Sequence, residues 1–217
     1  GWVSGMATAT HKFNIDRCTL ATHVAGGCLL PTKTGTLPRV GPLDTDCGCI
    51  SALKIKADAA MQHDAATWGQ AQSMRFYAKG LVFSNRALES IPYTQKAAEY
   101  FFRAYGATSI DGLVIRADLA MAFGCSGHTY WERALEMWKL IQHDLNCLPE
   151  TADGAMLRKQ IACDKFFAES TMYTKTEDRA RALHKAFEAG RAIQHPFLMR
   201  IIVELEIIGA PKADIVV

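Results

Sequence analysis

Apolar residues recur at helical spacing along most of the chain, and glycine or proline closes each run. After Pro92, for example, Ala97, Phe101 and Ala104 fall on one side of a predicted helix that Gly106 ends. Residues 51–80 predict one or two helices, depending on whether Gly69 is tolerated inside one. Similar runs predict helices over 112–124, 131–141, 154–170, 180–187 and 198–208. We therefore expect an all-α fold from residue 51 onward.

Two helix starts are predicted by the spacing of a capping box. Thr129 with Glu132, and Thr174 with Glu177, place a hydroxyl and a carboxylate three residues apart ahead of an apolar run. These starts are 45 residues apart, and each such interval holds two helices. Periods of roughly 34 to 47 residues with a helix pair per unit are typical of α-solenoids, so we predict a short solenoid of helix-turn-helix repeats. A generic helical bundle is the alternative.

The first 50 residues differ from the rest of the chain. They contain three of the seven prolines, seven glycines and eight threonines, and show neither helical nor strand periodicity. Only seven of them are charged, whereas a solvated tail normally carries many charges. We predict two parts: an extended, non-helical arm over 1–50 that lies along a partner, and a helical-repeat domain over 51–217.

One stretch of the predicted solenoid resembles the pentatricopeptide repeat family. Residues 127–151 place Ala134, Trp138, Ile141 and Pro149 where that family has a partner-facing alanine, two large apolar residues and a proline followed by an acidic residue. Shorter matches occur over 96–111 and 181–196, so the resemblance covers about 92–208. The residues predicted to pack within and between repeats are Ala97, Phe101, Ala134, Leu135, Trp138, Ile141, Pro149, Leu183 and Phe187.

Charge argues against a polyanionic partner. The chain has 24 Lys and Arg against 22 Asp and Glu, and residues 126–217 hold 12 basic and 13 acidic side chains. An RNA-binding solenoid would concentrate positive charge there, so nucleic acid is not expected. No apolar run is long enough to span a membrane.

Few residues suggest a catalytic, binding or metal site, and each such group has a simpler explanation. Cys125 near His128 could form a nucleophile and base, but the pair lacks a third orienting group and is better explained as turn residues. Trp131 and Trp138 could stack on bases, but their spacing favours the core. A zinc site is the alternative to free thiols for six residues whose spacing fits no standard zinc motif: His11, Cys18, His23, Cys28, Cys47 and Cys49. We predict no enzyme activity, cofactor or metal.

These observations favour a structural or accessory subunit that docks on other proteins. The chain begins at Gly1 and has seven cysteines, an odd number. We therefore expect a processed protein of a reducing organelle, the mitochondrial matrix, with a plastid as the alternative. A further resemblance, to the pentatricopeptide-like accessory subunits of the euglenozoan mitochondrial ATP synthase, implies a non-catalytic position on the F1 head. The alternative function is that of an organellar RNA-binding protein of the pentatricopeptide type.

Overall fold

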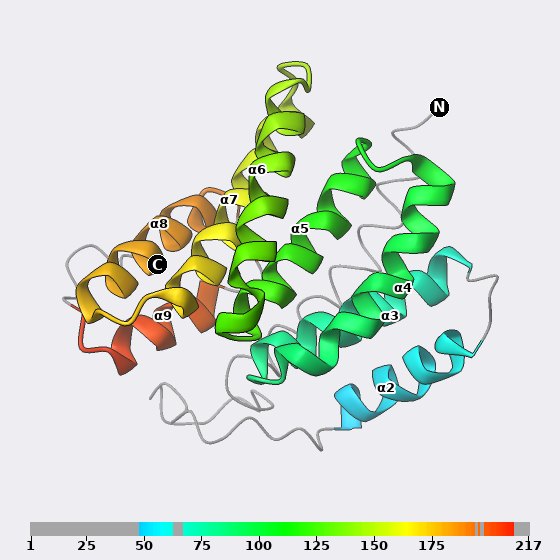
Figure 1. Ribbon diagram of the computed structural model, residues 1–217, viewed down its shortest axis with the longest axis horizontal. Coiled ribbons are helices and arrows are strands. Elements are labelled where there is room, and N and C mark those ends of the chain that lie inside the picture. Colours follow the sequence, from blue (N-terminus) through cyan, green and yellow to red (C-terminus); the bar gives the residue numbers. More distant parts are fainter. Residues whose placement is uncertain (1–47, 63–66, 194, 196–197, 211–217) are drawn as a thin grey trace, which may run out of the picture.

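Every regular element that the structure describes is a helix. The computed structural model describes residues 48–62, 67–193, 195 and 198–210, and no strand occurs among them. The α-helices, with a short 3-10 turn η1 (His128–Tyr130) before α6, are α2 (Gly48–Met61), α3 (Trp68–Phe83), α4 (Ala87–Tyr105), α5 (Ile110–Cys125), α6 (Trp131–Asn146), α7 (Ala152–Met172), α8 (Thr176–Arg191) and α9 (Leu198–Ile207). The prediction of an all-α fold is confirmed (Figure 1).

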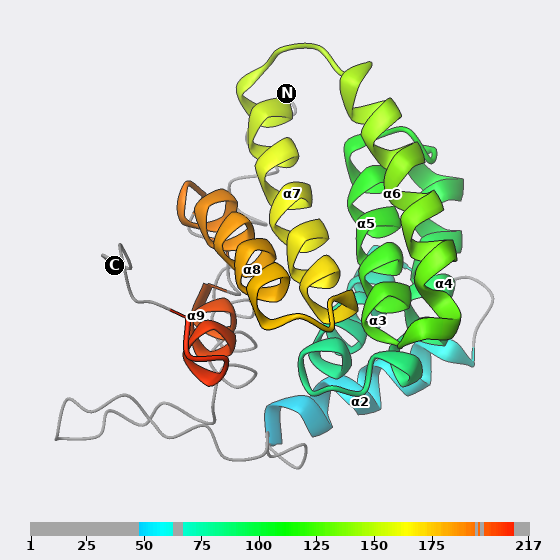
Figure 2. The same ribbon diagram turned by 60° about the vertical axis from the view of Figure 1, so that its left-hand side comes forward.

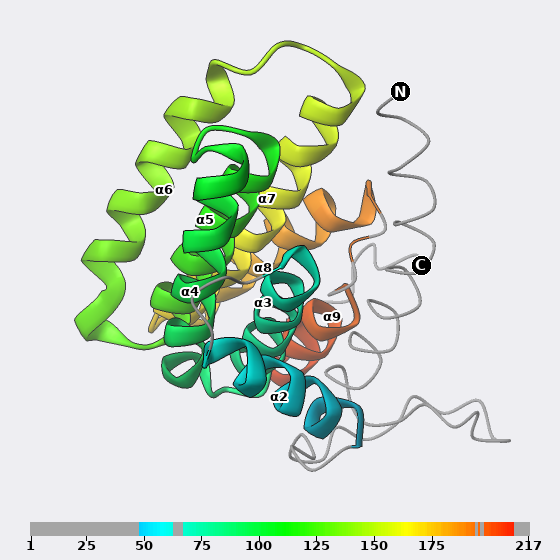
Figure 3. The ribbon, with the colours of Figure 1, turned by 90° about the vertical axis from the view of Figure 1, so that its right-hand side faces the viewer.

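Helix α5 is the centre of the molecule. It packs against α3, α4, α6 and α7, whereas α6 packs mainly on α5 and lies at the periphery (Figures 2 and 3). Eleven of the sixteen residues of α5 are buried. The helix predicted over 112–124 is therefore confirmed, along with the expectation that it is buried on most sides. Its position is the reason that Asp118, a charged residue in the middle of α5, lies in the interior.

The buried apolar side chains form two groups that meet at α5. The larger group joins α5 to α6, α7, α8 and α9 and includes part of α3 and α4, and the smaller joins α2, α3 and α4 to Ile115 of α5. Seven of the nine predicted packing residues lie in these groups: Ala97, Phe101, Ala134, Trp138, Ile141, Leu183 and Phe187.

The other two predicted packing residues are not part of the core. The side chain of Leu135 is 43% exposed. Helix α6 buries Ala134, Trp138 and Ile141, and Leu135 lies about 100° around the helix from Ala134, so it faces away from α5. Pro149 is exposed in the connection to α7, where its carbonyl accepts the Thr151 N–H at 2.9 Å.

The helix starts that the structure shows differ from the predicted capping boxes. Helix α6 begins after the 3-10 turn and α8 after Lys175, and neither has a side-chain cap, so both predicted boxes are wrong. Caps form instead at Thr67 of α3, where the box is completed by Gln70, and at Ser109 and Thr151.

Two further boundaries also need correction. Helix α4 begins at Ala87 and contains Pro92, which was expected to precede it. Pro92 lies on the exposed side, beside a Leu88 that is 56% exposed, so water can bind the Leu88 carbonyl that proline leaves without its helical partner. Residues 51–80 belong to two helices, α2 and α3, and Gly69 is tolerated in the first turn of α3. The predicted arm lies outside the described residues up to position 47, and α2 begins at Gly48, inside the range 1–50.

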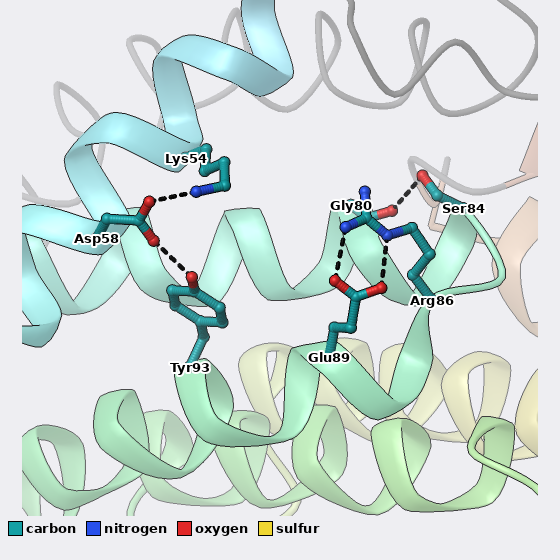
Figure 4. Close-up of polar contacts among 7 residues, drawn as sticks. All are labelled: Lys54, Asp58, Gly80, Ser84, Arg86, Glu89 and Tyr93. Carbon is teal, nitrogen blue, oxygen red and sulfur yellow. Dashed lines mark hydrogen bonds and ion pairs between the residues drawn. The ribbon is translucent and has the colours of Figure 1, made fainter.

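Polar contacts join α2 to α4 and brace the start of α4 (Figure 4). The Asp58 carboxylate accepts hydrogen bonds from Lys54 Nζ and from Tyr93 Oη, each at 2.5 Å. These two bonds lower the pKa of Asp58. Arg86 binds Glu89 through two parallel bonds of 2.7 and 2.6 Å. Tyr93 therefore links helices that are separated by α3 in the sequence.

Gly112 is required by a close approach of the chain to itself at the start of α5. Its N–H donates to Ser109 Oγ at 3.0 Å, and a Cβ atom there would lie 2.2 Å from the carbonyl oxygen of Gly106. We expect Gly112→Ala to lower the free energy of unfolding by about 1 to 3 kcal/mol, because backbone atoms cannot move aside cheaply. Urea unfolding followed by circular dichroism measures the loss.

Gly69→Ala is the matched control. A Cβ at Gly69 meets only Thr67 Oγ1, at 4.0 Å, so alanine should stabilise the helix by about 0.5 to 1 kcal/mol. Equal effects of the two substitutions would show that the tight turn before α5 does not constrain the fold.

Candidate functional site

Charged side chains meet in the interior where α3, α5 and α7 come together. Helix α3 contributes Arg75 and Lys79, one turn apart on the same face. Asp118 comes from α5, Asp164 from α7, and His195 precedes α9. Each of these five side chains is less than a tenth exposed. Buried charges are costly unless they are paired, so the pairing determines what this cluster can do.

The five groups form a continuous chain of ion pairs. Asp118 accepts a hydrogen bond from Arg75 Nε through one carboxylate oxygen, and Lys79 Nζ lies 2.7 Å from the other. Lys79 Nζ is also 4.0 Å from Asp164 Oδ2. On its other side Asp164 faces His195, with Oδ1 3.4 Å from Nε2. Burial disfavours the Asp164 carboxylate, but Lys79 and His195 outweigh it and lower the pKa of Asp164.

A second charged group lies between α8 and α9. The two oxygens of Glu204 bind one guanidinium each, with Arg179 Nη2 and Arg200 Nη2 both at 2.5 Å. Arg200 also reaches Asn85 in the turn after α3, at 3.5 Å from Nη2 to Oδ1. Arg200 is 8% exposed and Arg179 is 35% exposed, so this group extends from the interior to the surface.

A pocket opens beside the second group. Its volume is about 240 Å³. Two arginines and one glutamate supply its charge, and the remaining walls come from α3, α5, α7 and the turns that follow α3 and α7. The lining residues are Val82, Asn85, Cys125, Phe167, Ser170, Thr171, Tyr173, Arg179, Arg200 and Glu204.

Cys125 is a thiol in this pocket, and its environment keeps it protonated. Burial raises the pKa of Cys125 to about 12, although a hydrogen bond with Thr171 acts in the opposite direction. His128, the imidazole considered as its base, instead stacks on Trp131 with ring centroids 3.7 Å apart. Cys125 is the last residue of α5 and His128 the first of η1, so the interpretation of both as turn residues is wrong, and the two groups are not paired as nucleophile and base.

The two tryptophans differ in burial. Trp138 is 2% exposed and packs in the core, which agrees with the predicted packing role. Trp131 is half-buried under His128. Among the residues that the structure describes, no three His, Cys, Asp or Glu side chains are grouped to hold a metal ion. The thiols and imidazoles of the first 47 residues lie outside that part of the chain.

Sequence patterns did not identify the charged cluster or the pocket. The available signal was a charge inside a helix that is otherwise apolar: Asp118 is flanked by Ala117 and Leu119 in the run 112–124. Its counter-charges come from α3, more than 35 residues earlier, and nothing in the sequence pairs the two segments.

Comparisons with protein-family models, with curated proteins and with solved structures find no match to this chain. Within the described part of the chain, no helix combines the length and the apolar character needed to cross a membrane.

Proposed function

We propose that the protein is a non-catalytic accessory subunit of a mitochondrial multiprotein assembly, in which it serves as a rigid helical scaffold. The observation that carries this proposal is that buried charged side chains form ion pairs between different helices. Asp118 joins α5 to α3, Asp164 joins α7 to both α3 and His195, and Glu204 joins α9 to α8. Such ion pairs fix how helices that are distant in sequence sit against one another. A fixed arrangement suits a protein that presents a binding surface.

The packing of alternate helices supports the repeat interpretation. Helix α5 contacts α3 and α7 as well as its neighbours in sequence. Helices α5 and α7 also begin with the same cap, Ser109 or Thr151 accepting the N–H of a glycine three residues later, and the two caps are 42 residues apart. Stacked helix pairs have this geometry. We infer a short solenoid of pentatricopeptide-like units over about 92–208, and the F1 head of ATP synthase is the first assembly to test.

Purification of the tagged full-length chain from its native organelle tests the proposal. The extract is divided and one half is treated with RNase before affinity capture, and the retained proteins are quantified by mass spectrometry. We expect the same set of subunits, in fixed ratios to the chain, in both halves. Recovery of the chain alone, or loss of its partners after RNase treatment, would overturn the scaffold proposal.

The three arginines of α8 are paired within the protein, which disfavours RNA as the partner. Arg179 binds Glu204, Arg181 lies 3.4 Å from Asp178, and Arg191 lies 2.9 Å from Glu188. We expect no complex with single-stranded RNA tighter than about 10⁻⁶ M at physiological salt, measured by fluorescence anisotropy. A tighter complex whose affinity falls steeply with added salt would favour the RNA-binding alternative instead.

A further inference from the structure

Helices α5 and α7 start with the same short pattern, a capping hydroxyl followed two residues later by an aspartate and then by a glycine. The sequence is SIDG over 109–112 and TADG over 151–154. In both, the hydroxyl of Ser109 or Thr151 accepts the N–H of the glycine, at 3.0 and 3.1 Å. Both starts lie at the same end of the molecule (Figures 1 and 3). The local structure is shared, so a difference between the two aspartates has a cause other than helix formation.

The two aspartates differ in burial and in compensation of their charge. Asp153, in α7, is exposed to solvent. Asp111, in α5, is half-buried, and burial raises its pKa although the charge of Arg75 acts in the opposite direction. Arg75 binds Asp118, and within the described residues no hydrogen bond or ion pair involves Asp111. Asp111 is therefore a carboxylate that burial disfavours and that no cation of the described chain binds.

Two large apolar side chains next to Asp111 are open to solvent. Tyr105, the last residue of α4, and Ile110, the first of α5, are each 41% exposed. Tyr105 stacks on the buried ring of Phe101, with ring centroids 6.2 Å apart, which holds the exposed ring in place. Burial and nearby charges, that of Asp111 among them, raise the pKa of Tyr105, so the phenol and the carboxylate are within electrostatic reach of each other. At the start of α7, Cys147 occupies the position of Tyr105, and an alanine occupies that of Ile110.

From the unpaired, half-buried carboxylate and the two exposed apolar side chains, we propose that Tyr105, Ile110 and Asp111 form the docking surface for an arginine side chain of a partner subunit. A guanidinium binds a carboxylate through two parallel N–H bonds and stacks on an aromatic ring, and its hydrocarbon stem packs on an aliphatic residue. A cation brought to Asp111 also compensates the charge that burial disfavours. This inference rests on the proposed function, because the partner is a subunit of the same assembly.

Asp111→Asn separates a docking role from a structural role, because the two roles predict opposite changes. Asp153→Asn is the matched control, since it removes an acidic side chain from the same position of the first helical turn. The isolated Asp111→Asn chain should melt at a higher temperature than Asp153→Asn by circular dichroism, because it also loses an uncompensated half-buried charge. In tagged cells, Asp111→Asn should lower the recovery of partner subunits about tenfold or more relative to wild type, and Asp153→Asn should leave it unchanged.

A photo-crosslinking residue identifies the partner side chain in the intact assembly. We place p-benzoylphenylalanine at position 110 of the full chain, with position 152 as the control, and map the crosslinked peptides by mass spectrometry. Crosslinks are expected from position 110 alone, to one subunit and next to an arginine. Changing that arginine to aspartate should lower recovery about tenfold or more, and combining this change with Asp111→Arg should restore it.

The outcomes distinguish this inference from the scaffold proposal. Recovery of the wild-type chain without partners would overturn both. If the wild type is recovered with its partners, three results would overturn the docking surface alone: undiminished recovery with Asp111→Asn, a melting temperature of Asp111→Asn below that of Asp153→Asn, or a crosslinked peptide at position 110 that contains no arginine.

Discussion

Replacing Asp118 by asparagine is expected to lower the free energy of unfolding by about 3 to 5 kcal/mol. The substitution keeps the size of the side chain but removes the carboxylate that pairs directly with both Arg75 and Lys79. Both cations stay buried, with side chains 8% and 6% exposed, so neither can turn to water. Chemical unfolding at neutral pH, followed by circular dichroism, measures the loss.

Glu136→Gln is the matched control for this substitution. Glu136 is an exposed carboxylate in the middle of α6, so its removal should change stability by less than about 0.5 kcal/mol. A loss below about 1 kcal/mol for Asp118→Asn would contradict the interpretation of the charged cluster as the link between α3 and α5.

Trp138→Ala is expected to cost about 3 to 5 kcal/mol, because it leaves a large cavity between α6 and α5. Trp138 is 2% exposed and packs in the larger apolar group. Its indole Nε1 is buried and has no hydrogen-bond partner among the described residues, so Trp138→Phe should lose much less than alanine does. Urea unfolding of both variants gives the comparison.

Leu135→Ala on the same helix provides the contrast. Leu135 is 43% exposed, so its truncation should change the free energy of unfolding by less than about 0.5 kcal/mol. Equal losses for Leu135→Ala and Trp138→Ala would mean that α6 packs against the protein with a different face from the one described.

Helical periodicity was sufficient to predict the fold class and most of the core. It identified Ala134, Trp138 and Ile141 because residues three and four apart share a face of a helix. It failed at Leu135. This residue follows Ala134 in the sequence, but one step along a helix turns it about 100° away from the buried face, and its side chain is exposed. The capping boxes failed because a Thr and a Glu at the right spacing do not require a helix to start there, and the turn geometry around Gly127, with φ of 98°, starts α6 later.

The charged cluster could not be predicted from the sequence. Its ion pairs join residues 43 positions apart, as for Arg75 and Asp118, and sequence patterns describe neighbours along one element. Arg75 and Lys79 look like an ordinary solvated helix face until α5 and α7 are known to cover it. Arg179 lies on α8 and Glu204 on α9, and only the packing of these two helices brings them together.

The most direct measurement of the central claim is the mass of the native particle that contains the chain. Mitochondria from cells with an endogenous tag are gently solubilised, treated with RNase, and resolved by blue-native electrophoresis with detection of the tag. A scaffold subunit should migrate in a discrete particle many times heavier than the 23.9 kDa of the chain itself. Migration of all the tagged protein as a free monomer, or a heavy particle that collapses with RNase, would contradict the account.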